Sequence, residues 1–230
     1  MGFLASHKIK AILFDIDGTL YPKSYMNKYL FLASLSSPIF SLSYSKMRRE
    51  IRLLDGSEVQ PVLDLSAFRE KEAKIIYKGK PNINLDSYKK HYDKAIKQKW
   101  VRLFKGIKPY DGMNRTLEEA KAKGYILGAL SDFPLCGKLE TLGVDSLCSF
   151  KASCEDYGYL KPNPVPFLEM LKALALKPEE AIYLGDSYSK DILGAKQVGM
   201  YTCYLTQKTK DFPLSDIVVK SWNEMYNKLF

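Results

Sequence analysis

Two aspartates one residue apart, Asp15 and Asp17, follow the short apolar run Ile9–Phe14 and precede Gly18 and Thr19. Such a run predicts a strand that is buried on both faces, and the glycine predicts a sharp turn directly after it. Two unpaired carboxylates at this place would repel each other and lose hydration free energy, so a compensating cation is expected. Carboxylate oxygens suit Mg2+. An ordinary Asp-Gly turn is the alternative interpretation.

Polar side chains also follow two later apolar runs. Ser131 comes directly after the run Tyr125–Leu130, and Asp186 follows the run Ala181–Leu184 after one glycine. The carboxyl ends of parallel strands meet at one edge of a sheet, which is where open α/β proteins bind ligands. We therefore expect these side chains to lie close to Asp15.

Two further residues complete the set of candidates. Lys161 stands in the segment Leu160–Pro164, and Asp191 follows Asp186 at the start of a predicted helix. Each has an ordinary alternative, because a loop lysine is usually solvated and an aspartate favours the first turn of any helix. Ser131 could likewise only cap a turn. Together with the aspartates, these residues are better explained as parts of one site.

In this order the four clusters resemble the sequence motifs of the haloacid dehalogenase superfamily of phosphatases and phosphotransferases. The resemblance covers residues 9–20 and 108–205. Its most specific parts are Asp15-x-Asp17-Gly18-Thr19 at the start and Gly185-Asp186 at the end. The resemblance implies a Rossmann-like core, a phosphoric monoester hydrolase and Mg2+ as the cofactor.

The resemblance also implies roles for the four aspartates. Asp15 would be the nucleophile that forms an aspartyl-phosphate, and Asp17 would be the general acid and base. The carboxylates of Asp15 and Asp186 would bind Mg2+, with the backbone carbonyl of Asp17 as a further ligand. Asp191 would hold the surrounding shell in place.

Ser131 and Lys161 would bind the phosphate oxygens that do not react, if the resemblance holds. The acid at Asp17 narrows the choice of reaction within the superfamily. The superfamily's dehalogenases lack an acid at this position and its ATPases carry Thr, so Asp17 favours phosphate ester hydrolysis or a phosphomutase. A phosphatase acting on a small metabolite, such as a phosphosugar, a phosphoglycolate-like acid or a nucleotide monophosphate, is the leading hypothesis. A phosphomutase remains an alternative. A non-catalytic binding protein is a third, and the filled catalytic positions argue against it.

The rest of the sequence outside residues 21–105 alternates between apolar runs and helical patterns. The predicted strands are Ile9–Phe14, Tyr125–Leu130, Cys148–Ala152, Ala181–Leu184, Met200–Leu205 and Ile217–Val219. The predicted helices are Asp111–Lys123, Pro134–Leu142, Pro164–Leu174, Ser189–Val198 and one that begins at Trp222. Such alternation predicts an α/β fold with a doubly wound parallel sheet.

Residues 21–105, the helical block, show helical periodicity without strand patterns. We expect four helices there, carrying in turn Tyr25, Tyr29 and Leu32, then Leu42–Leu54, Leu63–Tyr77 and Leu85–Leu103. The block holds 18 Lys and Arg against 8 Asp and Glu, within a chain of net charge +9. We therefore predict a catalytic core of residues 1–20 and 106–230, and a smaller, basic, all-helical cap domain that closes over it.

The positive charge of the block could attract an anionic substrate, or it could belong to a solvated face. The stretch Tyr88–Tyr92, with Lys94, Lys97 and Lys99 after it, also resembles nucleic-acid-binding sequences in its mixture of aromatic and basic residues. Tyr88 and Tyr92 fall on the apolar stripe of a predicted helix, however, so we expect them to be packed. A small-molecule phosphate ester is the expected partner.

The four cysteines form no Cys-x-x-Cys pair, so they indicate neither a zinc site nor a redox motif. We expect free thiols in a cytoplasmic protein, because no secretory signal or membrane-spanning run is evident. The residues Met1–Ser6 fit the loose pattern for N-myristoylation at Gly2. The oligomeric state is left open by the sequence.

Overall fold

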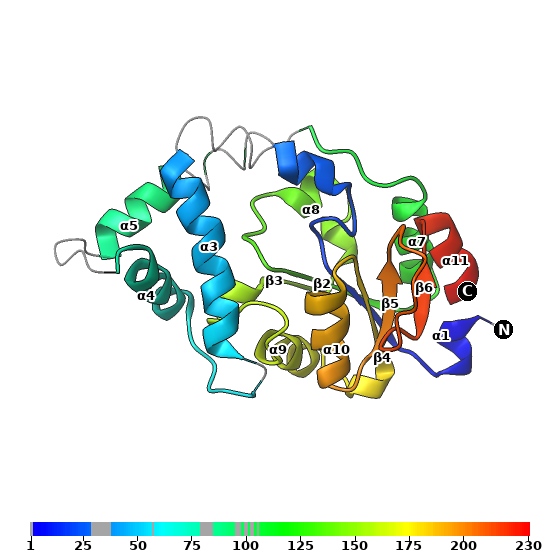
Figure 1. Cartoon of the computed structure of the whole chain (residues 1–230). Helices are drawn as coiled ribbons and strands as arrows, with labels where there is room; N and C mark the ends of the chain where they lie inside the picture. The colour runs from blue at the N-terminus through cyan, green and yellow to red at the C-terminus, as the bar shows by residue number, and fades with distance from the viewer. Residues whose placement is uncertain are drawn as a thin grey trace.

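The computed structural model describes residues 2–28, 38–56, 58–78, 85–94, 98, 101, 104 and 106–230. Its centre is a six-stranded parallel sheet with the strand order β3-β2-β1-β4-β5-β6 (Figure 1). The strands are β1 (Ala11–Phe14), β2 (Ile126–Ser131), β3 (Phe150–Ser153), β4 (Ala181–Gly185), β5 (Tyr201–Leu205) and β6 (Ile217–Val219). This architecture confirms the predicted doubly wound α/β fold.

Strand β1 lies at the point where the order of the sheet reverses, between β2 on one side and β4 on the other. Phe14, its last residue, pairs with Ala129 of β2 and Leu184 of β4. The three strands therefore end at the same edge of the sheet. In α/β proteins such a reversal opens a crevice for ligands.

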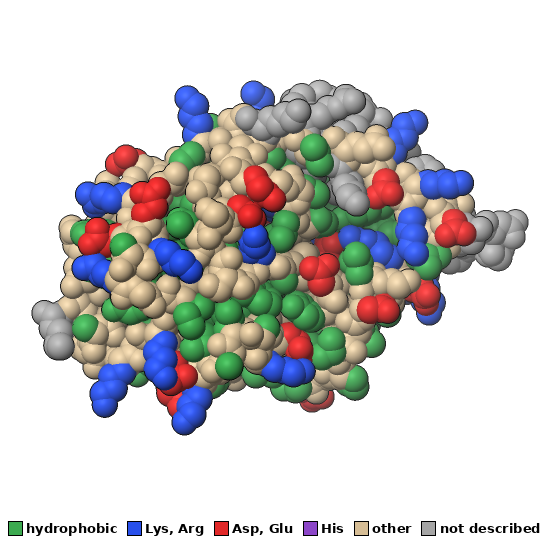
Figure 2. Space-filling model, turned by 180° about the vertical axis from the view of Figure 1, so that it is seen from behind, with side chains coloured by type: hydrophobic (Ala, Val, Ile, Leu, Met, Phe, Trp, Pro, Cys, Tyr) green, Lys and Arg blue, Asp and Glu red, His purple; other side chains and the backbone are tan. Residues whose placement is uncertain are grey.

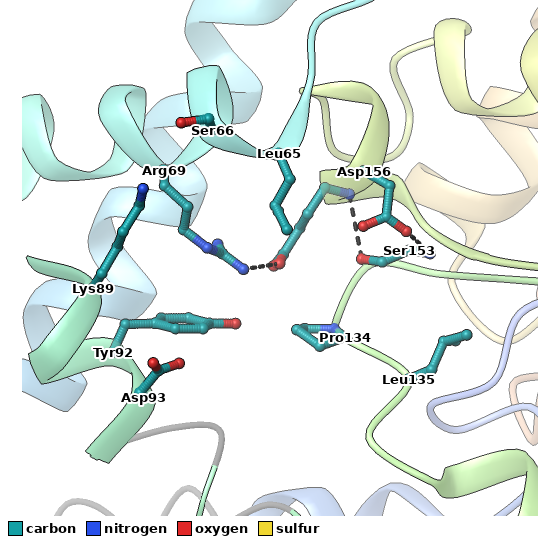
Figure 3. A pocket seen from close by; sticks show the side chains of 11 residues that line it. Leu65, Ser66, Arg69, Lys89, Tyr92, Asp93, Pro134, Leu135, Ser153 and Asp156 are labelled. Carbon is teal, nitrogen blue, oxygen red and sulfur yellow. Dashed lines mark hydrogen bonds and ion pairs between the residues drawn. The ribbon is translucent and has the colours of Figure 1, made fainter. Parts of the chain in front are cut away.

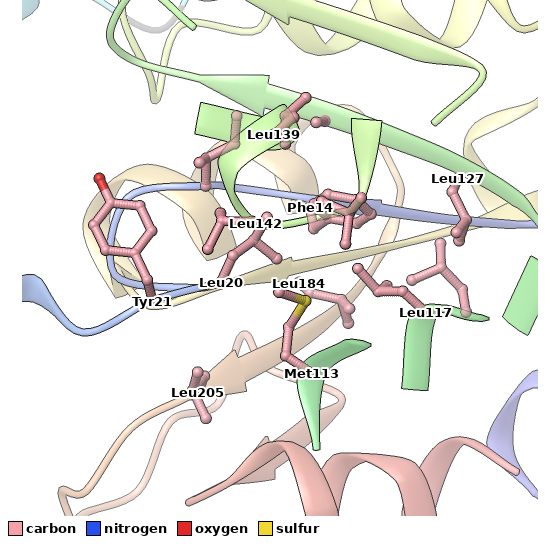
Figure 4. Packing of buried hydrophobic residues seen from close by; sticks show 14 of the residues in the cluster. Phe14, Leu20, Tyr21, Met113, Leu117, Leu127, Leu139, Leu142, Leu184 and Leu205 are labelled. Carbon is pink, nitrogen blue, oxygen red and sulfur yellow. The ribbon is translucent and has the colours of Figure 1, made fainter. Parts of the chain in front are cut away.

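The two faces of the sheet are covered by different helices, as the alternation of side chains along β1 requires. Ile12 and Phe14 belong to a core cluster that includes Met113 and Leu117 of helix α7 (Met113–Ala122) (Figure 4). Leu13 packs on the opposite face, in a cluster with residues of α9 (Val165–Ala173) and α10 (Leu193–Gln197). Both faces of β1 are fully buried, as expected for a central parallel strand.

Helices of different lengths connect and flank the strands. The longer ones are α3 (Pro38–Asp55), α4 (Leu65–Ile76), α5 (Leu85–Tyr92), α7 (Met113–Ala122), α9 (Val165–Ala173) and α11 (Trp222–Leu229). The shorter ones are α1 (Phe3–Ser6), α8 (Lys138–Thr141) and α10 (Leu193–Gln197). Single turns occur at η2 (Asp145–Leu147), η3 (Cys154–Tyr157), η4 (Pro178–Glu180) and η5 (Tyr188–Ile192).

Two predicted helices differ from the observed ones. Instead of the helix Pro134–Leu142, only α8 forms, because Cys136 and Gly137 both have a positive φ that interrupts a helix. The helix predicted to begin at Ser189 instead begins with the wide π turn η5. A π turn is often found at functional sites, and this one contains Asp191.

The helical block places α3, α4 and α5 at one end of the molecule, beyond the β3 edge of the sheet (Figure 1). Helix α3 ends at Asp55, as the Asp-Gly pair predicts, and Tyr88 and Tyr92 of α5 are buried as expected. Of the predicted helix that carries Tyr25, Tyr29 and Leu32, residues 23–28 are helical, and Tyr29 and Leu32 lie outside the described residues. Ile96, Trp100 and Leu103 of the last predicted helix lie outside them too. The division into a core and a cap domain stays a prediction.

All four cysteines are free thiols, as predicted from the sequence. On the face seen in Figure 2, Lys and Arg side chains are interspersed with Asp and Glu instead of forming one continuous basic patch. Among the described residues, the helices are too short or too polar to cross a membrane.

Candidate active site

Asp15 stands directly after β1 and continues its pairing, since its backbone N–H donates to the carbonyl of Leu184 at 3.0 Å. The turn that follows depends on Gly18, whose φ is +102°. A Cβ atom at Gly18 would clash with a carboxylate oxygen of Asp186. The glycine therefore permits both the turn and the close approach of Asp186, the residue that follows β4.

Lys161 joins two of the predicted aspartates. Its Nζ lies 2.6 Å from Oδ1 of Asp15 and 2.7 Å from Oδ1 of Asp191, and it also donates to the carbonyl of Leu130 and the hydroxyl of Tyr183, both at 3.1 Å. The lysine is only 1% exposed. The solvated-loop interpretation of Lys161 is therefore wrong, because a buried ammonium needs this set of partners.

Asp15, Asp186 and Asp191 form a compact group of carboxylates. Their nearest oxygen atoms all lie within 4.8 Å of one another. Burial raises the pKa of Asp15 to about 7 and that of Asp186 to about 6, and the neighbouring carboxylates add to both effects. Such a group can hold a hard divalent cation, whose charge would favour the ionised carboxylates. The chemistry of these donors therefore fits Mg2+.

Lys23 also reaches this group, from the segment that follows the first motif. Its Nζ lies 2.5 Å from a carboxylate oxygen of Asp186, although about half of its side chain is exposed. Burial alone would lower the pKa of Lys23, but the carboxylate of Asp186 outweighs that effect and raises it. The sequence offered no reason to separate this lysine from the others of the helical block.

Asp17 has a separate set of partners. Lys138 Nζ donates to both of its carboxylate oxygens, at 2.9 and 2.7 Å, Ser131 Oγ donates at 2.7 Å, and the Tyr21 hydroxyl donates as well. Burial would raise the pKa of Asp17, but the ion pair with Lys138 and these hydrogen bonds outweigh it and hold the pKa below its ordinary value. The side chain of Asp17 is thus engaged outside the group of three carboxylates.

Lys138 and Tyr21 were missed by reasoning from the sequence. Lys138 is fully buried at the start of α8, within a segment that read as an ordinary amphipathic helix. Tyr21 marked only the beginning of the helical block. A single lysine or tyrosine seven or four residues from a motif carries no pattern that distinguishes it from a surface or core residue.

The structure thus brings all six predicted residues to one edge of the sheet, in two groups. The first group surrounds Lys161 and comprises Asp15, Asp186 and Asp191. The second surrounds Asp17 and includes Ser131, whose Oγ also accepts the backbone N–H of Phe133 at 3.0 Å. The position of Ser131 therefore combines the predicted turn cap with a direct contact to Asp17.

Helix α3 contributes a further cation to the loops of the site. Arg52 donates to the carboxylate of Asp132 at 2.6 Å and to the carbonyl of Lys161 at 3.0 Å. Asp132 in turn accepts the backbone N–H of Lys161 at 2.9 Å. Burial would raise the pKa of Asp132, but Arg52 and the neighbouring lysines outweigh it and hold the pKa well below its ordinary value. The helical block therefore contacts the segments that carry Ser131 and Lys161.

A hollow of about 450 Å³ adjoins the carboxylate group. The residues that line it include Gly18, Asp186, Thr206, Trp222 and Asn223. Trp222 is fixed there because its indole N–H donates to the carbonyl of Thr19 at 2.8 Å. The hollow is large enough for a small organic molecule beside the group of three carboxylates.

Known proteins share both this sequence pattern and this fold. Residues 12–205 match the family model described as haloacid dehalogenase-like hydrolase. The chain belongs to that family. The family membership confirms the resemblance drawn from the four motifs, and it identifies the chain as a hydrolase.

Two relatives and one solved structure show which proteins this haloacid dehalogenase-like hydrolase resembles. A glyceraldehyde 3-phosphate phosphatase of Methanopyrus kandleri is 30% identical over 202 residues, which cover 84% of this chain and 82% of the relative. The pyrophosphatase PpaX of Bacillus cereus is 26% identical, covering 88% and 86%. The structure of CbbY from Rhodobacter sphaeroides in complex with phosphate has a TM-score of 0.67 at 19% identity, covering 94% and 96%.

Proposed function

We propose that this hydrolase is a Mg2+-dependent phosphatase that acts on a small phosphorylated metabolite. The observation that carries the proposal is the group of Asp15, Asp186 and Asp191 around Lys161 at the end of β1. Relatives of the chain that are named as a glyceraldehyde 3-phosphate phosphatase and a pyrophosphatase support the choice of a phosphate ester or anhydride.

We assign the nucleophile to Asp15. A carboxylate oxygen of Asp15 attacks phosphorus, the bond from phosphorus to the leaving oxygen breaks, and an aspartyl-phosphate forms. Lys161 lies beside Asp15 and can pair with the phosphate oxygens that do not react. When bound by the carboxylates, Mg2+ supplies positive charge that offsets the negative charge of the phosphoryl group.

Asp17 serves as the general acid and base in this scheme. The cycle begins with Asp17 protonated: in the first step the acid gives its proton to the leaving oxygen, and in the second step the resulting carboxylate takes a proton from water. The resulting hydroxide attacks phosphorus, the bond to Asp15 breaks, and inorganic phosphate leaves. Lys138 and Ser131 hold the carboxylate of Asp17 in position between the two steps.

The helical block is proposed to act as the cap predicted from the sequence. The contacts of Arg52 with Asp132 and Lys161 support this role, because they place α3 against two loops of the site. A cap of this kind excludes water and adds contacts to the substrate. A cytoplasmic location remains a prediction.

A panel of phosphate esters tests the proposal. Purified protein should release inorganic phosphate from at least one small ester, and a panel that includes glyceraldehyde 3-phosphate, pyrophosphate and an aryl phosphate covers the relatives' named substrates. Release should require Mg2+ and should be absent from the Asp15→Asn variant. Isomerised sugar phosphate without phosphate release would favour the phosphomutase alternative. No turnover on any ester would contradict both.

A further inference from the structure

A second cavity lies between the helical block and the core, at the β3 side of the sheet. Its volume is about 400 Å³, and α4, α5 and the loops after β2 and β3 form its walls (Figure 3). The apolar part of the wall consists of Leu65, Pro134 and Leu135. Both the volume and the mixture of apolar surface with a few polar groups are typical of sites for small ligands.

This cavity is separate from the candidate active site. None of the predicted catalytic, phosphate-binding or metal-binding residues lines it. Arg48 stands between the two, since its guanidinium donates to the carboxylate of Glu155 in the cavity wall and to the carbonyl of Asp132 beside the site. The same guanidinium covers the ring of Phe133 at 4.3 Å. A ligand in the cavity therefore would not contact Asp15.

The hydroxyl of Tyr92 lies in the cavity wall without a partner. The side chain is only 4% exposed, and among the described residues nothing forms a hydrogen bond with its oxygen. In Figure 3 the ring extends across the cavity toward Pro134. A buried hydroxyl without a partner is costly, and an acceptor on a bound molecule would remove that cost.

The buried charged groups of the wall are paired within the protein. Arg69 pairs with Glu72 and Glu155, each at 2.5 Å. Asp156 accepts the backbone N–H of Ser153 at 2.9 Å. The two remaining charged side chains, Lys89 and Asp93, have opposite signs. The wall therefore favours an uncharged head group next to Tyr92.

We propose that this cavity is a second binding site, which takes a small uncharged molecule with an apolar body and one hydrogen-bond acceptor, such as an alcohol or an amide. Pro134 and Leu135 lie in the segment between Ser131 and Lys138, and both of those residues bind Asp17. An occupant that presses on this segment changes the setting of Asp17. The site is thus placed to regulate the hydrolase, a consequence that rests on the proposed function, whereas binding itself does not.

Three probes with the same apolar body test the site: benzyl alcohol, benzylamine and benzoate. Ligand-observed NMR should detect benzyl alcohol binding to the full chain more tightly than the two charged probes. Tyr92→Phe should weaken benzyl alcohol about threefold to tenfold, as expected for the loss of one hydrogen bond. Tyr226→Phe, a change on α11, is the matched control and should leave binding unchanged. Equal binding to wild type and Tyr92→Phe, or tighter binding of a charged probe, would overturn the proposal.

A variant that fills the cavity provides a second, independent test. Leu135→Trp should abolish binding of benzyl alcohol, while saturating inorganic phosphate should leave it intact. Displacement of benzyl alcohol by phosphate would assign the probe to the active site and overturn the proposal. Benzyl alcohol should also change kcat or KM in the wild type but not in Leu135→Trp. A hydrolase that binds the probe but is unaffected by it would overturn the regulatory role, and a protein without turnover would count against the proposed function alone.

Discussion

Two buried lysines neutralise different carboxylates of the site. Lys161 compensates Asp15 and Asp191, and Lys138 compensates Asp17. The consequences for the two aspartates differ. Burial raises the pKa of Asp15 to about 7, while Lys138 and two hydroxyl donors keep the pKa of Asp17 below its ordinary value despite burial. These shifts favour a protonated Asp15 and an ionised Asp17 in the metal-free protein. The proposed roles therefore require a bound cation that keeps Asp15 ionised and a proton on Asp17 when the ester binds.

The role of Asp17 can be measured through the leaving group. Asp17→Asn cannot give a proton, so esters with a poor, alkyl leaving group should lose on the order of a hundredfold to ten-thousandfold in the rate of phosphoryl transfer. An aryl ester such as nitrophenyl phosphate needs less protonation and should lose much less in the same step. Single-turnover kinetics on both esters provide the comparison. An equal loss on both would argue against Asp17 as the general acid.

Lys23 should compete with the metal for Asp186, because its ammonium lies 2.5 Å from that carboxylate. Lys23→Met is therefore expected to lower the dissociation constant of Mg2+ about twofold to fivefold, the scale of a partly exposed ion pair. Isothermal titration calorimetry measures this directly. Lys28→Met, an exposed lysine of the same segment, is the control and should not change it. Weaker Mg2+ binding in Lys23→Met would show that the lysine supports the site instead.

At the scale of elements, a buried ion-pair cluster joins the helical block to the core. Arg48 of α3 and Arg69 of α4 both pair with Glu155 of η3, and Arg69 also pairs with Glu72 of α4. Two cations of the basic block are therefore internal and serve structure. The remaining exposed lysines are the ones that can attract an anionic substrate.

Breaking this cluster should destabilise the protein strongly. Glu155→Gln leaves two buried guanidinium groups short of a carboxylate, so the free energy of unfolding should fall by about 3 kcal/mol or more. Chemical denaturation monitored by circular dichroism measures the change. Glu169→Gln removes an exposed pair with Lys172 and should cost less than about 1 kcal/mol. Comparable losses in the two variants would mean that the cluster adds little to stability.

Much of the core could be predicted from the sequence because its strands are short apolar runs next to glycine or acidic turns. The strand Ile217–Val219 and the start of α11 at Trp222 agree with prediction to the residue. The helix Pro134–Leu142 failed, since a positive φ at the non-glycine residue Cys136 cannot be read from residue types.

Site residues that belong to a sequence motif could be predicted. Site residues that lie far from their partner in the sequence could not. Asp15, Asp17 and Asp186 stand at strand ends, a position that the apolar pattern reveals. Lys138 reaches Asp17 across 121 positions of the chain. Lys138 pairs with Asp17 only because the chain after β2 folds back toward the end of β1. This ion pair is therefore a tertiary contact that no local sequence pattern reveals.

The molecule as a whole places two hollows on opposite sides of β1's end. One contains Asp186 and lies toward β5 and β6, and the other is lined by α4, α5 and the loops after β2 and β3. This separation allows chemistry in one hollow and recognition of a second ligand in the other. The face of the molecule seen in Figure 2 mixes charges of both signs.

Stability of the whole protein should depend jointly on Mg2+ and pH. The pKa values of Asp15 and Asp186 are raised to about 7 and about 6, so the folded protein holds these protons more tightly than the unfolded chain and loses stability as pH rises from about 4 to 7. Mg2+ bound as proposed would favour the ionised carboxylates and offset that loss. Its effect on Tm should thus be small near pH 5 and largest near pH 8. A Tm shift that is the same at both would contradict this linkage.

The most direct test of the account is to find the phosphoryl group during turnover. Acid quenching of the protein mixed with an ester that it hydrolyses, followed by peptide mass spectrometry, should locate one phosphoryl group on Asp15 in the wild type. The Asp15→Asn variant should carry none and should release no phosphate. A phosphoryl group on another residue, or phosphate release by Asp15→Asn at the rate of the wild type, would contradict the assignment of Asp15 as the nucleophile.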